Sequence, residues 1–197
     1  MKKSWIIWGA VILLVIIIFV SGKNGYNNMV SMNEQVKQQW AQVENVYQRR
    51  SDLIPNLVNT VKGVANFEKS TLTQVIEARA KATAVNINPK NLNAQSLKEF
   101  QSAQDNLSSS LSRLMVVVER YPDLKANQNF LDLQAQLEGT ENRITVERGK
   151  FNESAQAYNV YIRQFPRNIF AKMFGFEEKA YFEAQKGSEK APSVQFQ

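Results

Sequence analysis

Charged and polar residues placed on otherwise apolar helix faces are the first candidates for chemistry in this chain. Arg50 lies on a stripe of apolar residues spaced alternately four and three apart, the pattern of a helix face buried against partner helices. The stripe consists of Val36, Trp40, Val43, Tyr47, Ile54, Leu57, Val61 and Val64. Glu147 lies on a second stripe, together with Thr140 and Ser154. Because a buried guanidinium needs an acidic partner, the sequence predicts an ion pair between Arg50 and Glu147.

This set of buried polar residues has two interpretations. Either the side chains line a binding pocket inside a helical bundle, or they fix the register and pairing of the helices, as buried polar groups can. No further ionisable cluster joins them, which favours the structural role. If helices over 29–66 and 127–165 run antiparallel over their full lengths, Arg50 lies opposite about residue 144. Residue 144 is one turn from Glu147, and Glu141 is the competing partner for the arginine.

Pro55 gives the first of these helices a second unusual feature. A proline inside a helix lacks a hydrogen-bond donor, and its ring clashes with the preceding turn, at a cost of about 3 kcal/mol. The apolar stripe nevertheless continues in phase from Tyr47 to Val64, so the sequence predicts a kink and not a helix end. The carbonyl of Ser51 loses its partner, and we expect Asn56 or water to replace it. The predicted structural polar core consists of Arg50, Asp52, Pro55 and Glu147.

The composition excludes several kinds of active site. The chain contains no cysteine and no histidine. Disulfides, thiolate chemistry, the usual zinc ligands and every Ser-His or Cys-His arrangement are therefore excluded. Hydrolysis by carboxylates alone or by a Ser-Lys pair stays open, but no motif supports either. The sequence predicts no catalytic residue, no metal site and no cofactor.

The formal net charge of +6 does not indicate a nucleic-acid-binding protein. Three lysines, Lys2, Lys3 and Lys23, flank an apolar segment, and residues 1–23 hold no acidic residue. The rest of the chain carries 21 basic against 18 acidic residues. It also lacks a dense basic run with interleaved aromatic residues, so we expect no nucleic-acid partner.

An unbroken apolar run over 5–20 predicts a membrane anchor within residues 1–23. With its polar neighbours the run makes about 28 Å of helix, just enough to cross a bilayer core of about 30 Å. Trp5 and Trp8 cluster at one end, where indoles favour the membrane interface. A cleavable signal peptide is the alternative, since residues 20–22 suit cleavage. The run is longer than the usual core of a signal peptide, which favours a retained anchor.

The flanking charges predict the orientation of this single-pass anchor in the cell (inner) membrane. Lys2 and Lys3 precede the apolar run, whereas Lys23 alone follows it closely. The positive-inside rule then places the N-terminus in the cytoplasm and the remainder of the chain outside it. The difference is one or two charges, so the opposite orientation stays open.

The rest of the chain predicts an all-α fold. Residues 22–28 are interpreted as a polar bridge, and residues 85–95, rich in asparagine, as a loop. Ser96, with Glu99 three residues later, is typical of a capping box. The expected helices cover 29–66, 70–84, 96–121 and 127–165. Together they predict an N-terminal transmembrane helix followed by an antiparallel four-helix bundle with long first and last helices.

The chain is therefore divided into an anchor, a bundle, a C-terminal segment and a tail. The bundle is predicted to cover 24–166, the amphipathic C-terminal segment 167–185 and a disordered tail 186–197. An antiparallel last helix returns to the level of the membrane near residue 165. The aromatic segment that follows either caps the bundle or rests on lipid. The residues expected to contact the membrane surface are Arg167, Phe170, Lys172, Phe174 and Phe176.

Three long stretches of the sequence resemble the LemA family. They are QRRSDLIPNLVNTVKGVA (48–65), YPDLKANQNFLDLQAQLEGTENRITVERGKFN (121–152) and YNVYIRQFPRNIFAKMFGF (158–176). With the apolar segment, the resemblance covers nearly the whole chain. It implies a membrane-anchored helical-bundle protein. The resemblance indicates the fold and the location more firmly than an activity.

Two functions of different classes follow from these observations. The leading hypothesis is a non-enzymatic, membrane-anchored scaffold or assembly protein that organises the membrane or envelope. Its expected partners are lipid, further copies of itself and an unidentified protein. The alternative is a single-pass sensor or adaptor that binds a ligand or peptide through the bundle. A scaffold predicts a defined oligomer and no pocket, whereas an adaptor predicts a concave polar site near Arg50.

Overall fold

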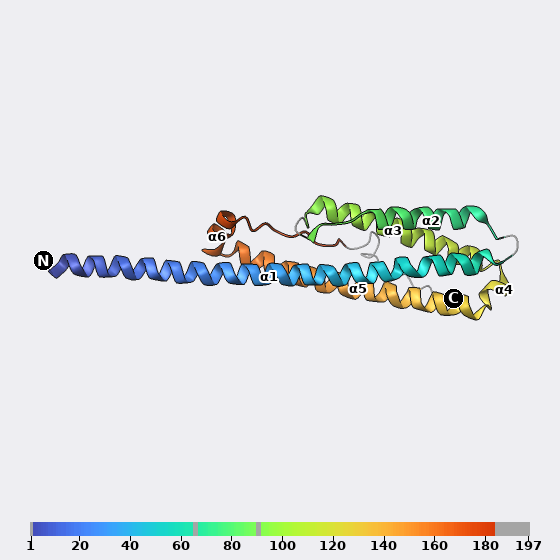
Figure 1. Cartoon of the computed structure of the whole chain (residues 1–197), viewed down its shortest axis with the longest axis horizontal. Helices are drawn as coiled ribbons and strands as arrows, with labels where there is room; N and C mark the ends of the chain where they lie inside the picture. Colours follow the sequence, from blue (N-terminus) through green and yellow to red (C-terminus); the bar gives the residue numbers. More distant parts are fainter. Residues whose placement is uncertain (1, 65–66, 90–91, 184–197) are drawn as a thin grey trace, which may run out of the picture.

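The computed structural model describes residues 2–64, 67–89 and 92–183, and these residues contain helices but no strand. The predicted fold class is confirmed (Figure 1). The tail predicted over 186–197 lies outside the described residues. The helices are α1 (Lys2–Lys62), α2 (Lys69–Ala84), α3 (Ala94–Val118), α4 (Pro122–Lys125), α5 (Gln128–Arg163) and α6 (Arg167–Phe174).

Helix α1 is much longer than the other helices, and its apolar first part projects beyond the bundle (Figure 1). The described large apolar side chains over 5–20 are exposed to solvent, and the segment is long and apolar enough to cross a membrane. The expected polar bridge over 22–28 is not a separate linker, because it is helical throughout. Anchor segment and bundle helix are therefore one continuous helix.

The bundle consists of two antiparallel helix pairs (Figure 1). Helix α1 packs mainly against α5, and α2 packs mainly against α3. The short helix α4 connects α3 to α5, while α6 lies against both α1 and α5 at the anchor side of the bundle. This arrangement leaves a seam between the two pairs, and the candidate site lies along it.

Two hydrophobic clusters fill the bundle, one on each side of Arg50 along α1. The anchor-side cluster is rich in aromatic residues and includes Met29, Val36, Trp40, Val43, Tyr47, Phe100, Phe151, Tyr158 and Phe182. The far cluster is mainly aliphatic and includes Ile54, Leu57, Val61, Leu72, Val75, Leu107, Leu114, Phe130 and Leu137. The stripe predicted over 36–64 contributes to both clusters, with Val36, Trp40, Val43 and Tyr47 in the first and Ile54, Leu57 and Val61 in the second.

The N-terminus of α3 differs from the prediction. The side chain of Asn93 caps the helix, because its Oδ1 accepts a hydrogen bond from the backbone N–H of Ser96 at 2.9 Å. Asparagine is among the most favoured N-cap residues, and its position starts the helix at Ala94. The predicted capping box at Ser96 is therefore wrong. The carboxylate of Glu99 accepts a hydrogen bond from the side chain of Gln95 instead.

The C-terminal segment predicted over 167–185 has two different parts. Helix α6 ends at Phe174, and the next residue, Gly175, adopts the left-handed conformation with φ 73° that favours glycine. Residues 176–183, here called the strap, are extended and return along the bundle (Figure 1). The strap buries Phe182, which is 5% exposed, within the anchor-side cluster. This part of the chain therefore belongs to the core.

Candidate functional site

Arg50 is the centre of a buried polar network that connects four helices. Its side chain is 2% exposed. Nη1 donates to Glu141 Oε2 of α5 at 2.8 Å and to Ser108 Oγ of α3 at 2.9 Å. Nη2 donates to Gln104 Oε1 of α3 at 2.5 Å. Because Gln104 Nε2 donates in turn to the carbonyl of Ala82 at 3.4 Å, the network also reaches α2.

The predicted pairing of Arg50 with Glu147 is wrong. Glu147 forms an ion pair with Lys150 on its own helix, at 2.8 Å. Helix α1 ends at Lys62 and not at residue 66, and α5 ends at Arg163 and not at residue 165. The prediction of which residues face each other assumed longer helices. With the observed ends, the residue of α5 opposite Arg50 is Glu141 and not residue 144.

Two other members of the predicted polar core do not lie in it. Asp52 and Pro55 are exposed on the outer side of α1, which continues through the proline to Lys62. The carbonyl that Pro55 deprives of its helical partner belongs to Ser51. It accepts a hydrogen bond from Arg79 Nε of α2 at 2.8 Å, and not from Asn56. The proline therefore creates an attachment point between α1 and α2.

Two residues that complete this network were not selected for the predicted polar core, although their positions in the sequence gave a signal. Gln104 lies four residues after Phe100 and three before Leu107, so it shares the buried face of α3. Arg79 lies seven residues after Leu72 on the inward face of α2. A polar residue at such a position becomes buried when its helix packs, so it needs a hydrogen-bond partner in the bundle, as Arg50 does.

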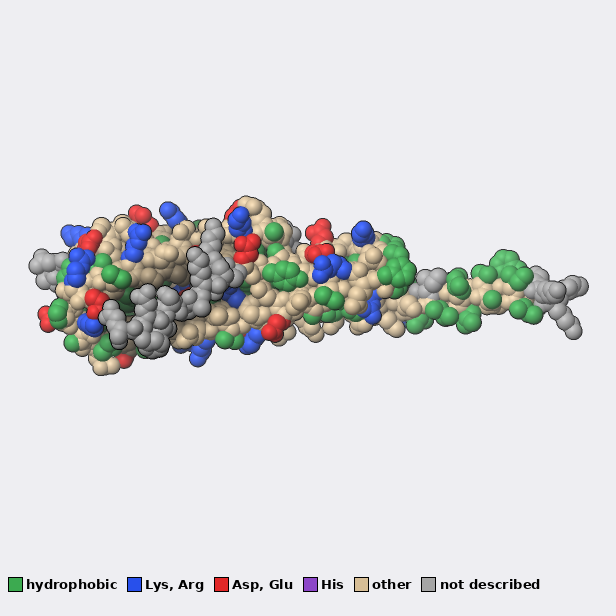
Figure 2. Space-filling model, turned by 180° about the vertical axis from the view of Figure 1, so that it is seen from behind, with side chains coloured by type: hydrophobic (Ala, Val, Ile, Leu, Met, Phe, Trp, Pro, Cys, Tyr) green, Lys and Arg blue, Asp and Glu red, His purple; other side chains and the backbone are tan. Residues whose placement is uncertain are grey.

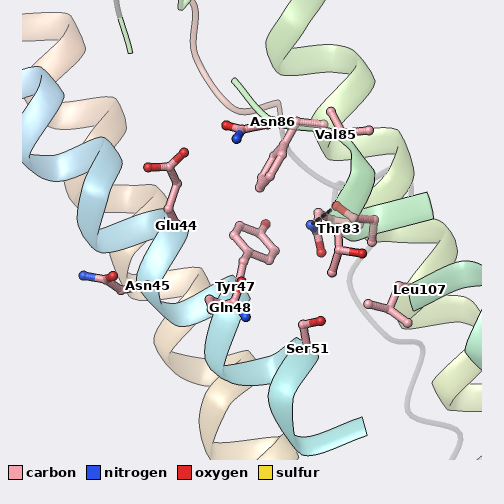
Figure 3. A pocket seen from close by; sticks show the side chains of 12 residues that line it. Glu44, Asn45, Tyr47, Gln48, Ser51, Thr83, Val85, Asn86 and Leu107 are labelled. Atoms are coloured by element: carbon pink, nitrogen blue, oxygen red, sulfur yellow. Dashed lines mark hydrogen bonds between the residues drawn. The ribbon is translucent and has the colours of Figure 1, made fainter. Parts of the chain in front are cut away.

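A cleft of about 260 Å³ lies beside this network, between α1 and the pair formed by α2 and α3 (Figure 3). Tyr47 and Glu44 extend into it from α1, facing Thr83 near the end of α2 and Asn86 just after that helix. The hydroxyl of Ser51 is buried at its edge and has no hydrogen-bond partner among the described residues. A concave polar site near Arg50 is the feature that the adaptor hypothesis predicts and the scaffold hypothesis does not.

Burial determines the electrostatics around the cleft. It raises the pKa of Glu44, against a smaller opposite effect of the Trp40 side chain. Burial also raises the pKa of Tyr47 and that of Asp105, although the cations Arg148 and Arg50 oppose the shift in both. Among the described residues, no group of three or more acidic side chains is placed to hold a metal ion. The cleft thus offers side chains that can donate and accept hydrogen bonds.

A second concave feature lies where the apolar segment of α1 meets α6. It is an apolar groove of about 560 Å³ lined by Val15, Phe19, Gly22, Lys23, Tyr26, Phe170, Met173 and Phe174. The ring of Tyr26 lies edge-on to Phe174, with 5.0 Å between ring centroids, and to Phe176 at 5.6 Å. Apolar side chains continue from this junction along the projecting part of α1 (Figure 2). The anchor segment and α6 therefore share one apolar surface.

The five residues predicted to contact the membrane surface lie in different environments. Phe170 and Phe176 pack against the anchor-side cluster. The guanidinium of Arg167 lies 4.1 Å from the centre of the Tyr161 ring, whereas Lys172 and Phe174 are exposed. Of the five, Lys172 and Phe174 are thus exposed on α6, whereas Phe170 and Phe176 contribute to the packing of the bundle.

A different set of apolar residues faces outward from this end of the bundle. Phe165 is 80% exposed, Ile169 57% and Met173 62%. Ile169 and Met173 are four residues apart and share one side of α6, and this spacing was the signal for them. Phe165 lies in the turn before the helix. The surface that can meet lipid is therefore formed mainly by residues that the sequence analysis did not select.

Comparison with known proteins gives a family and distant relatives. The model of the LemA family matches residues 39–196. Magnetosome protein MamQ of Magnetospirillum gryphiswaldense is 28% identical over 174 residues, covering 80% of this chain and 64% of the relative. MamQ 1 of Paramagnetospirillum magneticum is 27% identical over 175 residues, with the same coverage. Protein LemA of Metamycoplasma hominis is 23% identical over 158 residues, covering 80% of this chain and 68% of the relative. The chain spans less than two thirds of the length of the MamQ proteins that it matches.

Proposed function

This chain belongs to the LemA family, and we propose that it is a membrane-anchored scaffold whose bundle self-associates and organises the surrounding membrane or envelope. The observation that carries the proposal is the continuity of α1 from Lys2 to Lys62. A single helix joins the apolar segment to the bundle, so every copy would hold its bundle at the same height and orientation. The relatives described above are named for a magnetosome and for the family, and not for an enzymatic activity.

The mass of the purified full-length protein in detergent tests self-association. The chain has a mass of 22.5 kDa. We expect one discrete multiple of this mass after the contribution of the detergent is subtracted, and we expect it to persist on dilution. A monomer at every concentration would contradict the scaffold proposal.

The proposed orientation places the N-terminus in the cytoplasm and the bundle outside it. Lys2 and Lys3 before the apolar run, against Lys23 after it, support this orientation through the positive-inside rule. Because the chain has no cysteine, replacing the exposed Ser109 of α3 by cysteine (Ser109→Cys) would introduce a single site for labelling. A membrane-impermeant maleimide should label this variant in intact cells. Labelling only after lysis would place the bundle in the cytoplasm.

The scaffold would also contact lipid directly through α6. Phe165 in the turn before α6 and Ile169 and Met173 on α6 are exposed apolar residues, with Lys172 nearby for lipid phosphates. Met173 also lines the groove that α6 shares with the apolar segment of α1. The anchorless chain 27–197 should float with anionic liposomes, and changing these three residues to serine should abolish flotation. The matched control changes three exposed apolar residues elsewhere, Val116, Leu131 and Val146, to serine. Equal flotation of both variants would show that α6 is only a cap.

The cleft beside Arg50 supports a second candidate function, that of a sensor or adaptor that binds a small polar ligand. Its polar lining and the unpartnered hydroxyl of Ser51 are the supporting observations. Native mass spectrometry of protein purified from cells should show a bound adduct. Thr83→Trp, which fills the cleft, should remove it. A spectrum that contains only the bare chain would leave the scaffold as the function.

A further inference from the structure

The strap is attached to the bundle chiefly through its main chain. Asn159 of α5 makes two hydrogen bonds with Lys179, since Nδ2 donates to the carbonyl and Oδ1 accepts from the N–H, both at 2.8 Å. Asn152, two turns earlier on α5, does the same with Phe182, at 3.0 Å and 2.9 Å. Each asparagine thus satisfies both main-chain groups of one strap residue.

A third carboxamide repeats this arrangement on the opposite side of the strap. Gln101 of α3 donates through Nε2 to the carbonyl of Glu183 at 3.1 Å and accepts from its N–H at 3.3 Å. Arg148 of α5 donates to the same carbonyl at 2.8 Å. The N–H of Ala180 donates to the carbonyl of Leu92 at 3.2 Å. Side chains and main chain from both helix pairs therefore bind the strap as they would bind an extended peptide.

Phe182 is the one fully inserted side chain of the strap. Its ring stacks on Trp40, with centroids 6.1 Å apart, and lies edge-on to Phe151 at 5.5 Å. The guanidinium of Arg148 covers the other side, 4.7 Å from the ring centre. Such an aromatic pocket provides a large hydrophobic contribution and a defined position along the peptide. The carboxamides give attachment that depends little on sequence, and the pocket gives one point of specificity.

We propose that this groove also receives the strap of a second copy of the chain, so that neighbouring copies exchange their straps in the membrane. The contacts within one chain show that the strap fits the groove. Two copies that exchange straps would form the same contacts between chains. The continuous α1 would hold the grooves of all anchored copies at one height, which raises the effective concentration of a neighbouring strap. Residues 175–178 alone connect α6 to the first of these paired contacts. The inference rests on the proposed self-association and assigns a mechanism to it.

The absence of cysteine from the chain permits a direct test by disulfide trapping. Two full-length copies with different tags would be expressed together, one carrying Gln101→Cys and the other Glu183→Cys. Oxidation in isolated membranes, followed by a non-reducing gel, should give a covalent pair that contains both tags. Adding Phe182→Ala to the copy that supplies the strap should reduce this pair at least tenfold, because the strap loses its anchor.

Controls separate strap exchange from random collision and from loss of structure. Ser109→Cys lies on exposed α3, two turns from Gln101, and should give almost no pair with Glu183→Cys. A chain carrying both Gln101→Cys and Glu183→Cys reports whether the strap still reaches its groove. If this chain does not close, Arg148→Cys replaces Gln101→Cys, because Arg148 contacts the same carbonyl.

Each remaining outcome overturns the exchange. Disulfides confined to the doubly substituted chain would show that each strap stays in its own groove. An equal yield with Ser109→Cys would show collision, and a different protein trapped at Gln101→Cys would show another occupant. Any of these results combined with an oligomer in detergent leaves the scaffold proposal intact. A monomer in detergent without trapped pairs contradicts both proposals.

Discussion

The anchor-side half of the bundle and the far half are built from different side chains and different parts of the sequence. The anchor-side half joins aromatic rings from α1, α3 and α5 with Phe182 of the strap. The far half joins aliphatic residues of the ends of α1 and α3, the start of α5 and most of α2. The network of Arg50 separates the two halves. The half nearest the anchor thus depends on a late segment of the chain, whereas the far half is built from the helices and from Phe67 in the connection between α1 and α2.

Loss of Phe182 should have the largest effect. Phe182→Ala removes a buried ring and should lower the free energy of unfolding by about 3–5 kcal/mol. Phe130→Ala, in the far cluster, should have a similar total cost. Hydrogen exchange should distinguish the two variants, with faster exchange around Trp40 in the first and around Leu57 in the second. Loosening of both regions by both variants would show that the halves are one cooperative unit.

Loss of the carboxylate that pairs with Arg50 should come next. Glu141→Ala leaves a buried guanidinium with only neutral partners, Gln104 and Ser108, and should destabilise by about 1–3 kcal/mol. The effect stays below that of breaking a fully buried pair, because Glu141 is 45% exposed. Glu147→Ala, which breaks a pair within α5, should cost about 0–1 kcal/mol in chemical denaturation. A larger loss for Glu147→Ala would reverse the assignment of the partner.

The link between Arg79 and the carbonyl of Ser51 should be coupled to Pro55. Arg79→Met orphans the carbonyl and should cost about 1–2 kcal/mol. Pro55→Ala supplies the missing helical N–H to Ser51, so the same change should cost less in that background. A double-mutant cycle should give a coupling of about 0.5–1.5 kcal/mol. Additive effects would mean that the proline and the arginine act independently.

A smaller effect should distinguish two glycines near the anchor. A Cβ at Gly22 would lie 3.2 Å from the ring of Phe170, whereas a Cβ at Gly25 would meet no atom within 4 Å. Gly25→Ala should therefore stabilise the helix by up to about 1 kcal/mol, the difference in helix propensity. Gly22→Ala should gain less, because α6 must shift. Equal gains in thermal unfolding would show that α6 is not held against α1.

Alkaline pH should loosen the anchor-side half without any substitution. Burial, and to a smaller extent the negative charge of Glu177, raises the pKa of Tyr158 from 10.0 to about 12. The stabilisation from the neutral phenol is therefore complete below pH 10 and is lost as the pH rises through about 12. Tyr158→Phe should remove this part of the alkaline destabilisation in denaturant titrations. An unchanged profile would exclude Tyr158 as its source.

The sequence was sufficient for the helices, because their apolar residues recur with helical spacing and few other folds suit four such segments. The partner of Arg50 was missed by less than two turns of helix, since pattern alone does not determine where α1 and α5 end. The cleft beside Tyr47 lies between two helix pairs, and the residue pattern of one helix does not predict how far two pairs lie apart. The strap left no signal, because main-chain recognition requires no periodicity and Phe182 is a single anchor.

The continuity of α1 across the junction is the central claim, and a distance between two labels tests it most directly. Spin labels at Val20→Cys and Ala41→Cys are both exposed on α1, the first at the junction with α6 and the second beyond it within the bundle. A single rigid helix predicts one narrow distribution in lipid nanodiscs, centred near about 32 Å. A broad distribution, or one centred well below this distance, would show a flexible or bent junction and contradict the account.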